Sequence, residues 1–244
     1  MAFSEKELTI LNKFNFDVQP VGVKFLVRKP DMVERLGENL ALCEMLKKAQ
    51  EGNAFYVDPE NHACEAGLYV LGQADAPGPF ISGEFGAGLQ IFEAPRSASR
   101  LYLYIPKIAK EVVNYVAFSP LDKLPFEPDI MIFLATAPQT EIMLRAMSYK
   151  TGQMWQSKFS SAIGCAWLYI YPYLHGELNF ITTGLGHGIK RRGLFPEGLQ
   201  LISIPFDLLH SMLETLQEMP WVPPAYKPNG REFVKQVLTD LGVA

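Results

Sequence analysis

The order of predicted elements in the first half of the chain recurs in the second half, and this repeat constrains the fold more than any single motif. Each half is predicted to contain a strand, a helix, a second helix that carries a cysteine, and another strand. In the first half these elements are a strand at 21–26, a helix ending at Gly52, a helix with Cys64 ending at Gly72, and a strand at 101–106. In the second half they are a strand at 129–134, a helix ending at Gly152, a helix with Cys165 ending at Gly176, and a strand at 199–205.

The spacings between the predicted elements also agree between the two halves. Cys64 follows Gly52 by 12 residues, and Cys165 follows Gly152 by 13. Self-similarity at a fixed period is the signature of a repeat architecture. Two copies about a hundred residues apart therefore predict two related halves that face each other, with room for a ligand site between them.

Helices alternate with single strands along the chain, which predicts an α/β or α+β fold. We expect two pseudo-equivalent halves, 15–116 and 125–219, packed as one layered unit, and a single domain over 1–244. The connector at 118–128 is punctuated by proline but is also apolar, so it should pack rather than act as a flexible linker. A short amphipathic pattern at 232–241 predicts a C-terminal helical tail.

Composition excludes several classes of partner. The net charge of −4 offers no electrostatic footprint for nucleic acid, so nucleic-acid binding is not expected. The chain contains no run of 18 or more apolar residues, so we expect no membrane partner. The first residues lack the basic and apolar regions of a signal peptide, which predicts a cytoplasmic protein.

The three cysteines are the main candidates for chemistry. An odd number of cysteines in a cytoplasmic chain argues against a disulfide framework. Cys43, Cys64 and Cys165 form no C-x-x-C pair, so the sequence carries no zinc or ferredoxin signature. Cysteines on matching helices of two halves could still converge in space. Three thiolates would then hold zinc or an iron–sulfur cluster with one coordination position open.

A second interpretation of Cys64 is thiol catalysis. His62 lies two residues before it, near a helix start expected at Asp58 or Asn61. A helix N-terminus and a neighbouring imidazole both favour the thiolate, which is the nucleophilic form. In this interpretation Cys64 is the nucleophile and His62 the base. The structural alternative is that Cys64 is a small, inert side chain in a packing seam.

Two glycine-rich loops are candidates for anion binding, because glycine lets backbone amides approach a phosphate or carboxylate. They lie within 74–100 and at 182–188. The second loop leads into basic residues instead of completing a dinucleotide fingerprint, which disfavours a nucleotide. The predicted ligand-binding residues in and near these loops are Gly83, Gly86, Gly88, Gly184, Gly186, His187 and Arg191.

Four short motifs are spread over most of the chain. They are Leu-Cys-Glu-Met at 42–45, His-Ala-Cys-Glu-Ala-Gly at 62–67, Phe-Ser-Pro-Leu at 118–121 and Gly-Cys at 164–165. Together they resemble the uncharacterised ArCR family, a domain of unknown function of bacteria and archaea. The resemblance runs from about Val21 to about Leu216 and implies a shared fold without a mechanism.

Three functional hypotheses remain open at this point. The first is a cysteine-centred site between the halves that binds a metal, an iron–sulfur cluster or a small molecule. The second is a thiol-dependent enzyme that uses Cys64 and His62. The third is a structural or interaction protein without a cofactor, and aromatic side chains such as Trp155 or Trp221 would allow copies to associate into a homo-oligomer.

Overall fold

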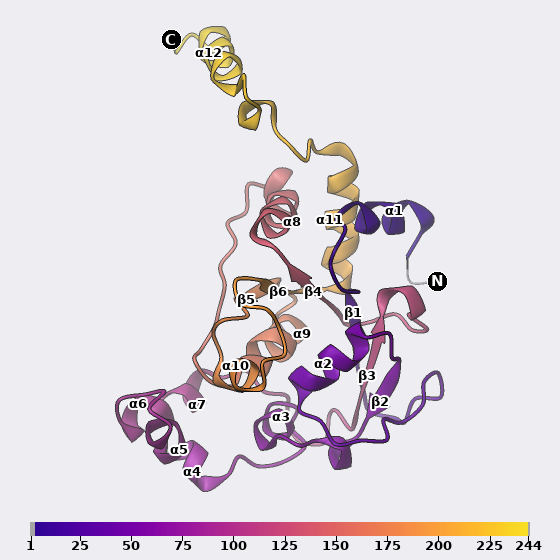
Figure 1. The fold of residues 1–244 in the computed structure, drawn as a ribbon, viewed down its shortest axis with the longest axis vertical. Coiled ribbons are helices and arrows are strands. Elements are labelled where there is room, and N and C mark those ends of the chain that lie inside the picture. The colour runs from indigo at the N-terminus through magenta and orange to yellow at the C-terminus, as the bar shows by residue number, and fades with distance from the viewer. Residues whose placement is uncertain (1–2, 244) are drawn as a thin grey trace.

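Six antiparallel strands form one sheet in the computed structural model, which describes residues 3–243 (Figure 1). The strand order is β2-β3-β1-β4-β6-β5. The strands are β1 (Val21–Leu26), β2 (Phe55–Val57), β3 (Tyr115–Pro120), β4 (Ile130–Ala135), β5 (Asn179–Thr182) and β6 (Gln200–Pro205). The mixed α/β class predicted from the sequence is confirmed, and the antiparallel pairing places the protein among α+β folds.

The central pair of strands joins residues from before and after the proline-rich connector. Val21 of β1 lies opposite Ile132 of β4, and the remaining strands are added outward from this pair. On one side β3 lies between β1 and β2, and on the other β6 lies between β4 and β5. The sheet thus takes three strands from each half of the chain, and β3 includes the first three residues of the predicted connector. The equivalence of the two halves stays a prediction.

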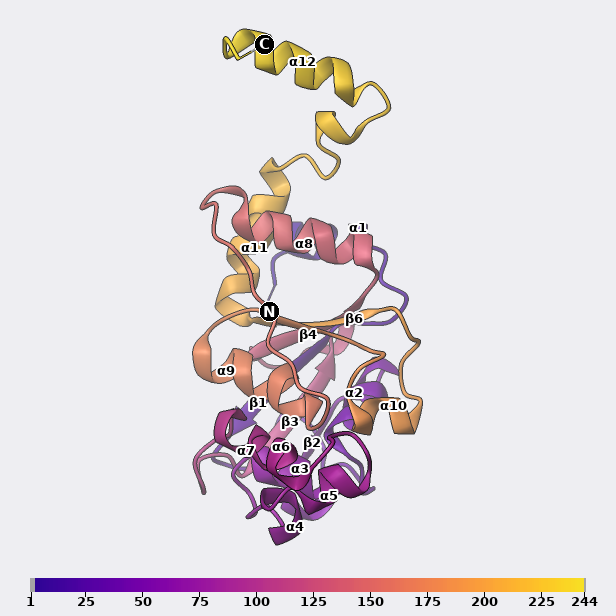
Figure 2. The ribbon, with the colours of Figure 1, turned by 90° about the vertical axis from the view of Figure 1, so that its left-hand side faces the viewer.

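Helices cover both faces of the sheet (Figure 2). The longer helices are α1 (Glu5–Lys13), α2 (Leu42–Gln50), α8 (Ala137–Tyr149), α11 (Phe206–Glu218) and α12 (Gly230–Asp240). Shorter helices are α3 (Glu65–Val70), α9 (Tyr171–His175), α10 (His187–Arg192), a 3₁₀ helix at Pro59–Asn61 and a π-helix at Ala166–Ile170. Helices α1, α8 and α11 pack on one face, and α2 and the π-helix pack on the other.

Strand β4 shows why the apolar runs become strands buried on both sides. Ile130 and Ile132 belong to the core beneath α2, whereas Met131 and Phe133 belong to the core beneath α8 and α11. Successive side chains of a strand point to opposite faces. A strand with helices on both faces therefore needs apolar residues at every position instead of an alternating pattern.

The strand predicted at 101–106 is wrong. Residues Leu101–Tyr104 form the short helix α7, and the first half takes its third strand from β3 instead. In a short apolar run, the periodicity of the residues does not distinguish a strand from a helix. Here Leu101 and Tyr102 line a cavity, while Leu103 and Tyr104 are 76% and 68% exposed.

The long irregular loop predicted at 74–100 is also corrected, because most of this region is helical. Four short helices follow one another: α4 (Gly78–Ile81), α5 (Glu84–Gly88), α6 (Pro95–Ser99) and α7 (Leu101–Tyr104). We call residues 78–104 the four-helix segment. Its helices pack chiefly on one another and lie beside the sheet rather than on it (Figure 1).

The predicted C-terminal helix is present as α12, which begins two residues before the expected start. It stands away from the sheet at the end of an extended segment (Figures 1 and 2). No helix within residues 3–243 combines the length and the apolar character needed to cross a bilayer.

Candidate functional site

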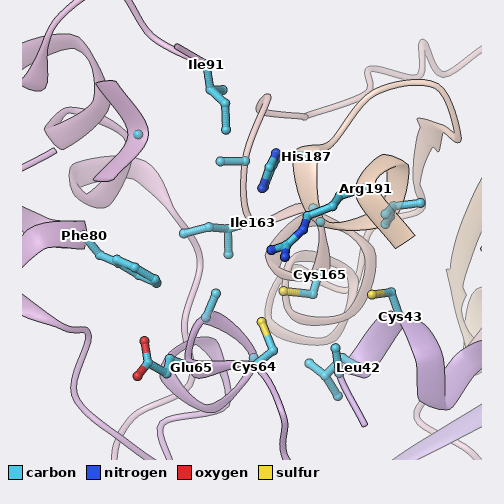
Figure 3. A pocket seen from close by; sticks show the side chains of 18 of the residues that line it. Leu42, Cys43, Cys64, Glu65, Phe80, Ile91, Ile163, Cys165, His187 and Arg191 are labelled. Atoms are coloured by element: carbon cyan, nitrogen blue, oxygen red, sulfur yellow. The ribbon is translucent and has the colours of Figure 1, made fainter. Parts of the chain in front are cut away.

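All three cysteines line one cavity of about 180 Å³. The cavity is bounded by the starts of α2 and α3, by the four-helix segment, by residues 162–169 and by α10. Its walls therefore come from both sides of the proline-rich connector. Figure 3 shows the sulfur atoms of Cys43, Cys64 and Cys165 gathered at one end, with Phe80, Ile91 and His187 farther away.

Each cysteine lies where a helix begins. Cys43 is the second residue of α2, and Cys64 is the N-cap residue of α3. Cys165 directly precedes the π-helix that continues into α9. The helix expected to start at Asp58 or Asn61 is only a 3₁₀ turn there, and α3 begins at Glu65. The first turn of a helix leaves backbone N–H groups free, so the site is rich in hydrogen-bond donors.

A buried hydrogen bond ties two of these helix starts together. The Tyr169 hydroxyl, in the π-helix, donates to the carbonyl oxygen of Leu42 over 2.9 Å. Tyr169 is only 1% exposed, so this bond is shielded from water. It fixes the start of α2, with Cys43, beside the segment that carries Cys165. π-helical turns inside helices are frequent at functional sites.

The backbone just before Cys165 is strained. Ile163 has a φ of +56°, in the left-handed region that β-branched residues rarely adopt. Its side chain points into the cavity (Figure 3). Such strain persists only where the surrounding structure imposes it, and it clusters at functional sites.

Asn179 holds the Cys165 segment against β5. It is 1% exposed, its Oδ1 accepts from the Lys158 N–H, and its Nδ2 donates to the carbonyl oxygens of Lys158 and Trp167. Replacing Asn179 with Ala should lower the free energy of unfolding by about 2 kcal/mol, because buried carbonyl groups lose their donor. Urea unfolding measures this effect. The exposed Asn53, which bonds only the Lys48 carbonyl, is the control, and equal losses for both Ala variants would contradict the prediction.

Burial keeps two of the thiols protonated at neutral pH. Burial raises the pKa of Cys43 to about 11, although the nearby Arg192 guanidinium acts in the opposite direction. Burial and the proximity of the other two cysteines also raise the pKa of Cys165. Thiolates are the nucleophilic form, so in this state neither Cys43 nor Cys165 is poised as a nucleophile.

The two arginines at the cavity differ in their partners. Arg192 Nε lies 3.4 Å from Glu44 Oε2, and its Nη1 donates to the Gly188 carbonyl oxygen over 3.1 Å. Arg191 also lines the cavity, but it has no hydrogen bond or ion pair with any other residue of the part that the structure describes. Figure 3 shows its guanidinium directed toward the cysteine end. Arg191 is therefore a cation without an ion-pair partner among the described residues, at a cavity whose wall is mostly apolar.

The structure does not bring His62 and Cys64 together as a catalytic pair. His62 is absent from the cavity wall, and neither of its ring nitrogens has a hydrogen-bond partner among residues 3–243. A thiol–imidazole pair requires such a bond between base and nucleophile. The ring lies instead against Gly67, where a Cβ would be 3.6 Å from His62 Nδ1.

The predicted ligand-binding residues separate into two groups. Gly86, His187 and Arg191 line the cavity. The structure does not place Gly83, Gly88, Gly184 or Gly186 on the cavity wall. Of these, Gly83 and Gly186 have positive φ angles of 82° and 93°, so they serve the backbone of the surrounding turns.

Sequence reasoning missed the aromatic wall of the cavity. Phe80, Phe85, Phe92 and Tyr102 all come from the four-helix segment. The available signal was the density of aromatic residues in a stretch otherwise rich in glycine and proline, where a surface loop would expose them. Within residues 3–243, no group of three or more His, Cys, Asp or Glu side chains is arranged to hold a single metal ion.

Comparisons with known proteins agree with this description. An uncharacterised protein of Methanocaldococcus jannaschii is 28% identical over 203 residues, which cover 81% of this chain and 86% of that protein. No solved structure matches the chain. The model of the family described as "Uncharacterised ArCR" matches residues 9–215, which include every element around the cavity. The chain therefore belongs to the uncharacterised ArCR family.

Proposed function

We propose that this protein binds a small organic anion with an apolar body in the cysteine-lined cavity. The observation that carries the proposal is Arg191, an exposed guanidinium without a partner in residues 3–243 that lines a mostly apolar cavity. Ligand sites are typically apolar cavities with a few convergent polar groups that fix orientation. Arginine is well suited to a carboxylate, because its planar fork donates two parallel hydrogen bonds.

The size and lining of the cavity limit the ligand. A volume of about 180 Å³ is close to that of the engineered cavity of about 150 Å³ that holds benzene in another protein. Phe80, Phe92 and Tyr102 offer aromatic surface at this scale. A ring-sized or branched aliphatic body with one carboxylate would bury its apolar part against these side chains and direct its charge to Arg191.

Benzoate is the probe that tests this proposal, and its uncharged analogue benzamide is the comparison ligand. Binding is measured by isothermal titration calorimetry on the full chain. We expect benzoate to bind more tightly than benzamide, and Arg191→Gln to weaken benzoate binding about tenfold through the loss of a charge-assisted bond.

Lys190→Gln is the matched control. Lys190 precedes Arg191 on α10 and its substitution removes the same charge, but its Nζ pairs with Glu197 over 3.2 Å outside the cavity wall. Benzoate affinity should therefore stay unchanged in this variant. Equal affinities for benzoate and benzamide, or an equal effect of the two substitutions, would refute recognition by Arg191.

A further inference from the structure

The convergence of the cysteines is not explained by packing. The chain contains three cysteines in total, separated by 21 and 101 positions, and all three line the same cavity. Unpaired cysteines that serve as core residues are usually among the most completely buried side chains. Here each of the three is only partly buried, while neighbours such as Leu42 and Leu168 are 1–2% exposed. The accessible part of each cysteine therefore faces the cavity.

The arrangement of the thiols around one cavity suits a cluster better than a single ion. Tetrahedral zinc with bonds of 2.3 Å requires its sulfur ligands to lie about 3.8 Å apart. No group in the described residues is drawn together for a single ion. A four-iron cluster is itself several ångström across and binds cysteines at separate corners, so it suits thiols that surround a space (Figure 3).

The charges around the thiols also suit an anionic cluster. Three thiolates bring negative charge into the cavity, and the guanidinium groups of Arg191 and Arg192 lie at its wall. Arg192 is close enough to act electrostatically on Cys43. Glu44 and Glu65 are the acidic groups nearby, but Glu44 is already paired with Arg192 and caps α2 by accepting from the Ala41 N–H.

We infer that Cys43, Cys64 and Cys165 bind a four-iron iron–sulfur cluster and leave its fourth iron without a protein ligand. Two Fe²⁺, two Fe³⁺ and four sulfide ions come from solution, so the [4Fe–4S]²⁺ cluster forms without transfer of electrons, and each thiol releases its proton to solvent as its Fe–S bond forms. The free iron faces the rest of the cavity, where the proposed organic anion would bind. The inference rests on the proposed function only in this shared use of the cavity.

Iron and labile sulfide in the full chain, purified without oxygen, test the inference. About four of each per chain are expected, together with visible absorption that is absent from the apo form. Cys43→Ser, Cys64→Ser and Cys165→Ser should each lower the iron content at least tenfold. Ala66→Ser, which adds a hydroxyl to the same cavity wall, should retain it. Circular dichroism shows whether each variant is folded.

If a cysteine variant does not fold, measurements on the wild-type protein still test the inference. Wild-type protein that binds no iron after incubation with equal amounts of Fe²⁺ and Fe³⁺ and with sulfide, or that holds zinc instead, would overturn the cluster. A folded cysteine variant with the full iron content would do the same. Benzoate binding measured on these preparations separates the two proposals, because Arg191→Gln should keep its iron while it loses benzoate affinity. Wild-type protein that stays iron-free after this incubation but binds benzoate would refute the cluster and leave the anion site standing.

Discussion

Acidification from pH 6.5 to pH 4 should destabilise the folded chain by about 3 kcal/mol through His62 alone. Burial lowers the pKa of His62 from 6.5 to about 4, and the nearby Asp58 only partly opposes this effect. Both ring nitrogens are shielded from water and have no partner among residues 3–243, so the folded state holds the imidazole neutral. The unfolded chain binds a proton below pH 6.5, whereas the folded chain does so only near pH 4. The free energy of unfolding therefore falls as the pH is lowered from 6.5 to 4. Above pH 6.5, His62 does not contribute to its dependence on pH.

Urea unfolding of the wild type and of His62→Leu at pH 7 and pH 4 isolates this contribution. Carboxylates with a lowered pKa, such as Glu7 and Asp58, also lose stabilising interactions in acid, but they do so in both proteins. At pH 7 the variant should lie within about 1 kcal/mol of the wild type, because the imidazole has no hydrogen bond to lose. At pH 4 it should be the more stable protein. Parallel dependence on pH in the two proteins would show that His62 is protonated in the folded state.

The elements with strong local signals could be predicted from the sequence. Strand β4 is an unbroken apolar run, β1 and β6 are largely apolar, and all three lie near proline; α8 and α11 present apolar residues at helical spacing. These patterns depend on neighbours along the chain, where the physical constraints are local. The order of strands in the sheet depends instead on which strands pair, and no pattern within one strand predicts that β1 pairs with β4. The misassigned helix α7 shows the same limit, because only the cavity beside it decides its conformation.

The candidate site could be predicted in its residues but not in its geometry. The three cysteines were identifiable because they are rare and because Cys64 and Cys165 fall at matching places, but separations of 21 and 101 positions do not reveal whether they meet. The hydrogen bond from Tyr169 to the Leu42 carbonyl joins the segments of Cys43 and Cys165, which lie far apart in sequence, and no local pattern predicts this contact. His62 illustrates the opposite case. It lies two residues from Cys64, and its ring nevertheless lies against Gly67 and makes no hydrogen bond with the thiol.

Gly83→Ala should unfold the four-helix segment and leave the sheet intact. An added Cβ would lie 1.9 Å from the Pro95 carbonyl oxygen and 2.7 Å from the Ser99 nitrogen, and both are backbone atoms that no side-chain rotation can move. The φ of +82° adds about 1–2 kcal/mol of conformational strain for any residue with a Cβ. Together these effects should cost the segment at least about 3 kcal/mol. Because its helices pack chiefly on one another, the loss should stay local.

Trypsin digestion reports this local opening, because Arg96 and Arg100 lie within the segment. A loss of about 3 kcal/mol should raise the cleavage rate about a hundredfold, since cleavage follows the population of the open state. The matched control is Gly88→Ala, which meets no atom within 4 Å and should leave cleavage unchanged. Benzoate affinity should fall in Gly83→Ala alone, because Phe80, Phe92 and Tyr102 then no longer close the cavity. If the two variants resist trypsin equally, the packing of Gly83 against Pro95 does not hold the segment together.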